Sequence, residues 1–205
     1  EHHSNIVPWQ LLRDRTGCVL KVVPVDEDGS FKLSDFDELI TKKTKIVAFC
    51  HVSNVLGTVL PVREIADIAH ARGAVVVIDG AQGLVHMPVD MQALDADFYV
   101  FSGHKLYAPS GVGVLYGKEA LLEAMPPYQG GGGMINTVSF EKTTWADLPD
   151  KFEAGTPPIA QAIGLGVAID YLSGIGMAAI AEHERALLNY ATQQLSAVEG
   201  LNFVG

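Results

Sequence analysis

The chain has 205 residues, of which 24 are acidic and 14 basic, so its formal net charge is −10. This balance argues against a broad surface for nucleic acid or for anionic membranes. Hydrophobic residues make up 48% of the chain, but they come in short runs, and none approaches the length of a bilayer span. Length and composition predict one large folded domain, or a domain with part of another, with neither nucleic acid nor membrane as a partner.

The two cysteines, Cys18 and Cys50, lie inside apolar runs typical of strands. Small buried thiols are therefore expected, rather than a disulfide or a metal pair. Residues 1–5 lack the basic, apolar and cleavage-site succession of a signal peptide. Together these features favour a reducing compartment, the cytoplasm.

In the first half of the chain, apolar runs alternate with segments of helical periodicity. Strands are expected over residues 18–25, 45–52 and 74–78. Helices are expected over residues 5–15 and 62–72, with Ser34 as the N-cap of a further helix between them. The strand, helix, strand order predicts a mostly parallel sheet with helices on both faces.

The second half continues this pattern and then changes to helices. Strands are expected over residues 97–102, 111–116 and 201–204, and helices over residues 118–125, 159–173 and 177–195. The glycines at 130–133 lack the lysine and the Ser/Thr of a P-loop and indicate a mobile connection. Residues 143–155 show no period and predict a surface excursion. We expect residues 1–155 to form a binding domain, and residues 156–205 to close it and begin a smaller domain.

Six polar residues collect at the ends of expected strands: Asn54, Asp79, Gln82, Ser102, His104 and Lys105. In open α/β sheets, ligands bind at the carboxyl ends of the strands. Each residue also has an ordinary structural interpretation. Asn54 suits a turn, Asp79 suits a cap, and His104 suits a hydrogen-bonded core histidine.

The combination points to chemistry, because one apolar strand ends in an acid and another in an amine. Pyridoxal phosphate needs an amine that binds it covalently, a carboxylate that keeps its ring nitrogen protonated, and donors for its phosphate. Lys105 and Asp79 supply the first two groups. Ser102 and His104 can donate to the phosphate, and Gln82 can hydrogen-bond the ring hydroxyl.

A metal site is the alternative for the histidines. The candidate ligands are Glu1, His2, His3, His51, His86 and His104. None of them forms the His-x-x-x-His pair with a general base that marks zinc peptidases. Metal binding therefore ranks below the cofactor hypothesis.

Six motifs follow one another along the chain, at residues 1–9, 51–57, 79–82, 102–107, 111–113 and 152–157. Together they resemble the SufS-type cysteine desulfurases of the class V aminotransferase family. The resemblance covers essentially the whole chain. It implies the large domain of a fold-type-I pyridoxal-phosphate enzyme, a three-layer α/β fold around a mostly parallel sheet.

The resemblance also implies a role for each residue around the cofactor ring. Lys105 would hold the cofactor covalently and move the α-proton of the substrate. Asp79 would pair with the ring nitrogen, and Gln82 would meet the ring hydroxyl. His2 would stack on the ring and assist proton transfer.

Further roles concern the phosphate and the substrate. Ser102 and His104 would bind the phosphate, helped by Thr156 from the second subunit of a homodimer. Asn54 would lie near the ring hydroxyl and the carboxylate of the substrate. Ala108 departs from the glycine that the family usually has in the loop after the lysine.

The reaction implied is the conversion of L-cysteine to L-alanine and an enzyme persulfide, whose sulfur passes to a SufE-type acceptor for iron-sulfur cluster assembly. In the family, the persulfide-forming cysteine and the carboxylate-binding arginine lie on a C-terminal part, and neither Cys18 nor Cys50 matches that cysteine. The 205 residues are therefore expected to carry the cofactor half and to be inactive alone. The alternatives are a selenocysteine lyase, a kynureninase-like lyase and a non-catalytic binding or assembly module.

Overall fold

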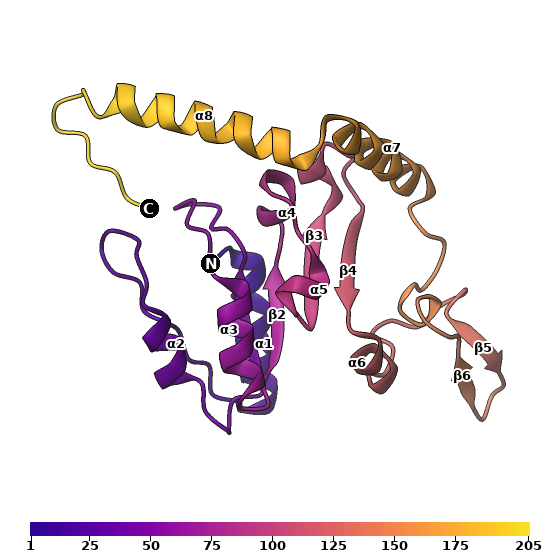
Figure 1. Ribbon diagram of the computed structural model, residues 1–205. Coiled ribbons are helices and arrows are strands. Elements are labelled where there is room, and N and C mark those ends of the chain that lie inside the picture. Colours follow the sequence, from indigo (N-terminus) through magenta and orange to yellow (C-terminus); the bar gives the residue numbers. More distant parts are fainter.

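Four strands form the main sheet, in the order β1-β2-β3-β4 (Figure 1). They are β1 (Ile46–Cys50), β2 (Val75–Asp79), β3 (Phe98–Ser102) and β4 (Gly113–Gly117). The first three are parallel, whereas β4 is antiparallel to β3. The computed structural model describes residues 1–205 and confirms a mostly parallel α/β sheet.

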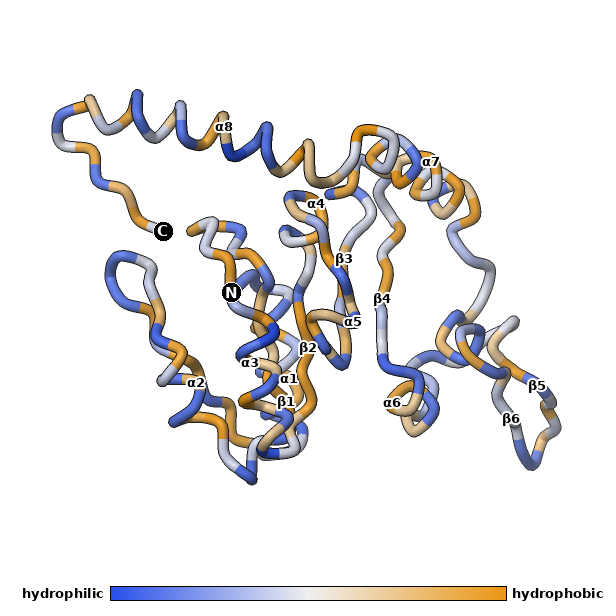
Figure 2. Tube along the Cα trace, viewed as in Figure 1, coloured by the Kyte–Doolittle hydropathy of each residue, from blue (hydrophilic) through white to orange (hydrophobic).

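The core forms where β2 meets the helix α3 (Val62–His70). Val76 and Ile78 alternate along β2 and are fully buried, as are Ile65 and Ala66 on α3. Figure 2 shows the hydrophobic colour running along β2. Because side chains alternate across a strand, one apolar face of β2 packs on one apolar stripe of α3.

The remaining elements surround this core. The helices are α1 (Val7–Thr16), α2 (Leu33–Leu39), α4 (Gly83–His86), α5 (Met91–Leu94), α6 (Glu119–Ala124), α7 (Ile159–Ile175) and α8 (Met177–Leu195). Three short 3₁₀ helices are η1 (His3–Asn5), η2 (Gly103–Leu106) and η3 (Asp150–Phe152). A separate hairpin joins β5 (Ile135–Val138) to β6 (Thr143–Trp145).

Two expected strands are wrong. Residues 18–25 and 201–204 have no regular secondary structure, and their apolar side chains are largely exposed: Val19 is 84% exposed. A strand needs a neighbour for its backbone groups, and neither segment lies beside one. As a result Cys18 is exposed, and only Cys50 is the buried thiol that was expected.

Two local expectations also differ from the structure. Ser34 is not an N-cap, because α2 begins at Leu33 and Lys32 occupies the cap position. The segment 143–155 is not irregular throughout, because it contains β6 and η3. The partner of β6 is β5, whose polar residues gave no alternating pattern; Thr137 and Thr144 are hydrogen-bonded across this hairpin at 2.6 Å.

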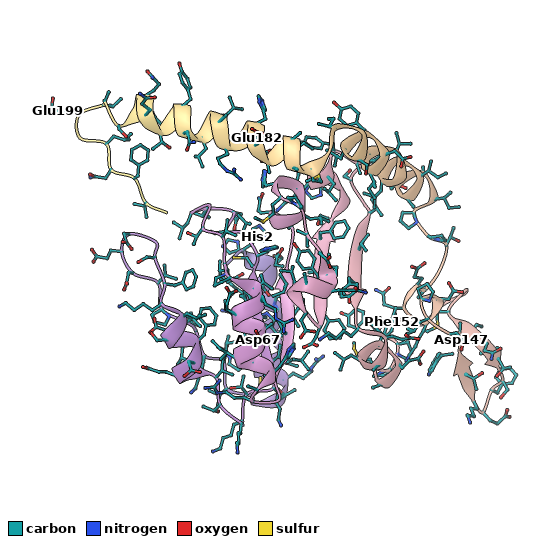
Figure 3. All side chains as sticks on the ribbon, viewed as in Figure 1. His2, Asp67, Asp147, Phe152, Glu182 and Glu199 are labelled. Carbon is teal, nitrogen blue, oxygen red and sulfur yellow. The ribbon has the colours of Figure 1, made fainter.

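The helix α8 extends away from the sheet, and few other side chains approach its outer part (Figures 1 and 3). Leu187, Leu188 and Tyr190 on it are more than half exposed. No single helix has the length and hydropathy of a membrane span. The pair α7 and α8, bent by 73°, meets the length and composition test only when taken together.

An ion cluster closes the amino end of the sheet around Asp97, whose side chain is 8% exposed. One carboxylate oxygen accepts from Lys118 Nζ at 2.8 Å. The other accepts from His70 Nε2 at 2.9 Å and from the backbone N–H of Val76 at 2.7 Å. Lys118 also pairs with Asp95 at 2.6 Å. The charge of Asp97 is thus compensated at the start of β3, where an unpaired buried carboxylate would be costly.

The cluster shifts the pKa of both carboxyl groups. Burial would raise the pKa of Asp97, but Lys118, the Val76 N–H and His70 together hold it below its ordinary 3.8. The hydrogen bond from Lys118 lowers the pKa of Asp95 in the same direction. A lowered folded-state pKa contributes stability above the unfolded-state pKa, and this stability is lost as the pH falls through the folded-state pKa.

We predict that Asp97→Asn lowers the free energy of unfolding at pH 7 by about 2 kcal/mol, because charge-assisted hydrogen bonds are lost. The variant should also lose less stability than the wild type between about pH 5 and about pH 3. Urea denaturation at several pH values measures both effects. Asp67→Asn, which removes an exposed i,i+4 partner of Arg63, is the control and should cost about 0.5 kcal/mol or less. An equal effect of the two substitutions would contradict the role of the cluster.

Candidate functional site

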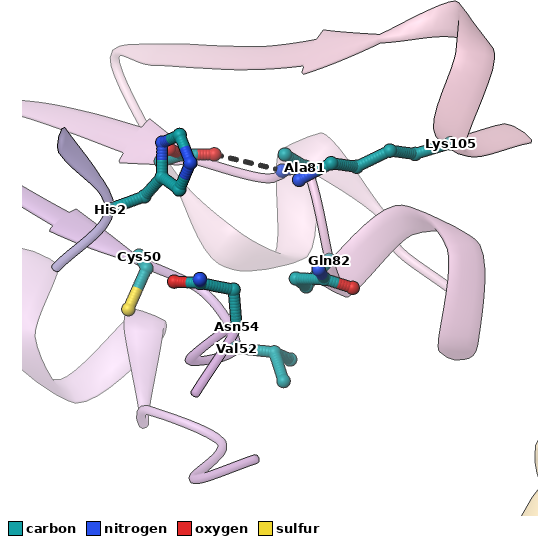
Figure 4. A pocket seen from close by; sticks show the side chains of 8 residues that line it. His2, Cys50, Val52, Asn54, Ala81, Gln82 and Lys105 are labelled. Atoms are coloured by element: carbon teal, nitrogen blue, oxygen red, sulfur yellow. Dashed lines mark hydrogen bonds between the residues drawn. The ribbon is translucent and has the colours of Figure 1, made fainter. Parts of the chain in front are cut away.

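A small pocket lies where the carboxyl ends of β1, β2 and β3 meet (Figure 4). Its lining residues are His2, Cys50, Val52, Asn54, Asp79, Ala81, Gln82 and Lys105. Five of the eight residues expected at a site therefore line one pocket, although they come from four separate segments of the chain.

Asp79 ends β2 and is half-buried. Its Oδ1 accepts a hydrogen bond from the backbone N–H of Ala81 at 3.0 Å, drawn as the dashed line in Figure 4. The other carboxylate oxygen has no partner within the protein. The backbone N–H thus holds one oxygen in place and leaves the second available to a ligand.

Lys105 follows β3 in the short helix η2 and is half-buried. Figure 4 shows its side chain extending to the pocket beside Ala81. No hydrogen bond or ion pair occupies its amine. Because β2 and β3 are adjacent and parallel, this amine and the Asp79 carboxylate reach the same pocket. An unpaired amine of this kind is suited to bind a carbonyl compound covalently.

Gln82 connects the pocket to His86 and Glu184, neither of which was expected to act with it. Its Oε1 lies 3.1 Å from His86 Nε2, and His86 Nδ1 lies 2.9 Å from the carboxylate of Glu184. His86 is one turn after Gln82 on α4, whereas Glu184 comes from α8. The spacing of Gln82 and His86 is visible in the sequence, but the contribution of Glu184 depends on how α8 packs.

The first residues of the chain attach to the end of β1. Glu1 accepts a hydrogen bond from the backbone N–H of Cys50 at 2.8 Å and another from the Asn5 side chain at 2.8 Å. The Nδ1 atom of His2 accepts from the backbone N–H of Ser4 at 3.2 Å. A neutral His2 therefore carries its proton on Nε2. His2 and Lys105 approach the pocket from opposite sides (Figure 4).

Three expected site residues do not line the pocket. Ser102 is half-buried at the end of β3, and His104 is exposed in η2 next to Lys105. Thr156 is exposed in the segment before α7. Their expected roles toward a phosphate stay predictions.

Three further residues line the pocket: Cys50, Val52 and Ala81. The resemblance places Ala81 at the floor of the site, opposite His2, whereas Cys50 and Val52 were not expected there. Their places at the end of β1, beside the expected residues, were the available signal. Burial, helped by the neighbouring Glu1 carboxylate, raises the pKa of the Cys50 thiol to about 12. The Cys50 thiol therefore lines the pocket in its protonated, uncharged form. No group of three or more His, Cys, Asp or Glu side chains is arranged to hold a metal ion.

Fold and site together define the class: an α/β protein whose lysine and carboxylate meet at the carboxyl ends of adjacent parallel strands. The model of the aminotransferase class-V family matches residues 1–205. The chain belongs to this family.

Three proteins show what the chain is similar to. The cysteine desulfurase of Escherichia coli O127:H6 (strain E2348/69 / EPEC) is 55% identical over 206 residues, which cover 100% of this chain and 51% of that protein. The crystal structure of the cysteine desulfurase CsdA from Escherichia coli, in an S-sulfonic acid form, has a TM-score of 0.94 and 44% identity, over 98% of this chain and 50% of that one. A C-DES mutant with glycine covalently linked to its PLP cofactor has a TM-score of 0.82 and 26% identity, over 97% and 54%.

These matches confirm the expected class V aminotransferase family and the fold-type-I architecture. The chain spans about half the length of the curated relatives it matches. The residues of the pocket, and the sheet that positions them, all lie within the matched part.

The two thiols give a direct test of the burial and charge around the pocket. We predict that iodoacetamide at pH 8 modifies the exposed Cys18 rapidly in the native protein and leaves Cys50 unmodified, because only the thiolate reacts. Peptide mass mapping distinguishes the two sites. Glu1→Gln removes the neighbouring negative charge and should increase labelling of Cys50 above pH 9, which is roughly where an ordinary thiol ionises. Equal labelling of both thiols at pH 8 would show that Cys50 is not protected.

Proposed function

We propose that this chain is the cofactor-binding half of a pyridoxal-phosphate-dependent cysteine desulfurase of the SufS type. The main support for the proposal is that two chemically complementary groups line the same pocket without bonding to each other. One is a carboxylate with a single oxygen free, and the other is an amine with no partner. The names of the relatives, cysteine desulfurases matched over the whole chain, support the same function.

The residues present fit this cofactor. Lys105 offers the amine, Asp79 the carboxylate, and Gln82 and Asn54 two amides, all within one pocket. When bound, pyridoxal phosphate supplies an electron sink that stabilises a carbanion at the α-carbon of an amino acid. A free carboxylate oxygen is the group that holds a proton on the ring nitrogen, and so keeps that sink electron-poor.

We assign the other roles from the same placement. Lys105 binds the cofactor and moves the α-proton of the substrate. His2 covers the ring and assists proton transfer, and Gln82 donates to the ring hydroxyl. Its Oε1 is engaged by His86, so its amide N–H groups are the ones left for that bond. Asn54 lies at the pocket wall, where it can meet the carboxylate of an amino acid.

The phosphate ligands are a further part of the proposal. Ser102 and His104 belong to the same strand end as Lys105, and both can donate hydrogen bonds to phosphate oxygens. Thr156 is exposed and away from the pocket of its own chain. We assign it to the site of a second copy in a homodimer.

The proposed reaction breaks the carbon–sulfur bond of L-cysteine. A cysteine thiolate takes the sulfur as a persulfide, and the remaining carbon skeleton accepts a proton to become L-alanine. Cys50 does not provide that thiolate, because its raised pKa keeps it protonated. The persulfide sulfur then passes to a SufE-type acceptor protein for iron-sulfur cluster assembly.

The proposal includes the surroundings of the site. Residues 1–155 form the cofactor-binding domain, and residues 156–205 close it and lead into a smaller domain. The helix α8 fits this division, since it extends from the sheet (Figure 1). The two unpaired thiols fit a reducing, cytoplasmic compartment.

The first test is covalent attachment of the cofactor. We predict that borohydride reduction of the cofactor-loaded protein leaves the cofactor mass on the peptide that contains Lys105. Lys105→Ala should abolish this label and the visible absorption band. Lys43→Ala, which changes an exposed lysine, is the control and should retain both. An unchanged visible absorption spectrum in the Lys105 variant would contradict the assignment of Lys105 as the residue that binds the cofactor.

The second test separates the charge of Asp79 from its structural hydrogen bond. Asp79→Asn keeps an oxygen for the Ala81 N–H but removes the negative charge, so the cofactor should still bind while turnover falls on the order of 10³-fold. Alanine release from cysteine in the full natural chain measures the effect. Parallel assays with selenocysteine and kynurenine identify the substrate. Preference for either of these, or turnover that survives Asp79→Asn, would contradict the proposed function.

A further inference from the structure

A buried polar pair lies beneath the turn that carries Asp79. His51 is 6% exposed and Tyr99 is fully buried. His51 Nδ1 lies 3.0 Å from the Tyr99 hydroxyl, and the two rings meet edge to face at 88°. The pair joins β3 to the residue directly after β1, and so passes under the end of β2. Neither residue lines the pocket itself.

Two glycines show how closely the turn rests on this pair. A Cβ atom at Gly80 would lie 1.8 Å from Cε1 of Tyr99. A Cβ atom at Gly83 would lie 2.6 Å from Nδ1 of His51. Neither position has room for a side chain while the rings stay in place. The backbone between Asp79 and Gly83 therefore lies directly against both rings.

Backbone hydrogen bonds connect the same residues. The N–H of His51 donates to the carbonyl of Asp79 at 2.9 Å, and the N–H of Gly80 donates to the carbonyl of Val100 at 2.8 Å. The start of the turn is thus bonded on both sides, to the residue after β1 and to β3. The side-chain hydrogen bond between His51 and Tyr99 joins the same two neighbouring segments beneath the turn.

Burial also keeps both members of the pair neutral. It lowers the pKa of His51. It raises the pKa of Tyr99, and the negative charge of Asp79 raises it further. A neutral pair introduces no charge that would compete for the Asp79 carboxylate. A single directional hydrogen bond in a buried site also defines the orientation of both rings, which purely apolar side chains would not do.

We infer that His51 and Tyr99 are positioning residues for the cofactor site. By fixing the turn from Asp79 to Gly83, they set the direction of the free Asp79 oxygen and of the Gln82 amide. The consequence for pyridoxal phosphate rests on the function proposed above, whereas the hold on the turn does not. The inference is therefore tested with and without the cofactor.

Tyr99→Phe removes only the hydroxyl and keeps the ring beneath Gly80. In the full natural chain without cofactor, we expect amide hydrogen exchange of the segment 79–83 to become about tenfold faster, and cofactor affinity to weaken about tenfold. Tyr116→Phe is the matched control. Tyr116 faces Tyr99 across β3 and β4, packs against the same core, and has no hydrogen bond from its hydroxyl. It should change neither quantity.

A second pair of variants tests His51, the other partner in this hydrogen bond. His51→Gln keeps a side-chain acceptor for the Tyr99 hydroxyl, whereas His51→Leu has none. We expect the Gln variant to retain more of the exchange protection and of the cofactor affinity than the Leu variant. Equal behaviour of the two would overturn the inference, because it would mean that the hydrogen bond itself is not needed.

The outcomes distinguish a positioning role from a purely structural one. A Tyr99→Phe variant that melts at a lower temperature, but exchanges its 79–83 amides and binds cofactor as the wild type does, would overturn the inference. Failure of the wild type to bind pyridoxal phosphate would refute the proposed function instead. The exchange experiment on the unloaded protein would still decide whether the pair holds the turn.

Discussion

The hydrogen bond from the Ala81 N–H to the Asp79 carboxylate is the interaction on which the site depends. This bond occupies one oxygen of a carboxylate at the end of a buried strand, and it leaves the other oxygen available to a ligand in the pocket. The turn that makes this bond must pass over two buried rings, so it needs glycine at positions 80 and 83. Because β2 lies between β1 and β3, the same turn is also hydrogen-bonded to both neighbouring chain segments: the Asp79 carbonyl accepts from the His51 N–H, and the Gly80 N–H donates to the Val100 carbonyl.

Charged side chains are paired at the amino end of the sheet and left without partners at its carboxyl end. At the amino end, Asp97 is surrounded by Lys118, His70 and a backbone N–H, so its charge is compensated within the protein. At the carboxyl end, the Lys105 amine has no partner, and Asp79 keeps one oxygen free. Paired charges stabilise the fold, whereas unpaired groups in a pocket are available to a ligand. The difference supports a functional role for the carboxyl end and a structural role for the amino end.

The pocket also depends on segments that are distant in sequence. Glu1 attaches the N-terminal residues to the end of β1, which places His2 at the pocket, and Glu184 on α8 supports Gln82 through His86. Displacement of either segment would alter the pocket without changing any strand. In the family to which the chain belongs, the relatives it matches are about twice as long. The exposed apolar side chains of α8 mark a part of the surface that the sheet itself does not cover.

The amino-acid sequence alone predicted the strands that carry the site, because β1, β2 and β3 are short apolar runs with polar residues at their carboxyl ends. It also placed Asp79 and Lys105 at one edge of the sheet, since parallel strands end on the same side. It misassigned residues 18–25, because apolar composition does not show whether a neighbouring strand exists to satisfy the backbone. It could not show that Glu1 reaches the Cys50 amide, that Glu184 reaches His86, or that Tyr99 meets His51 beneath Gly80. Those contacts join residues 48 to 98 positions apart, and only the packing of the folded chain brings them together.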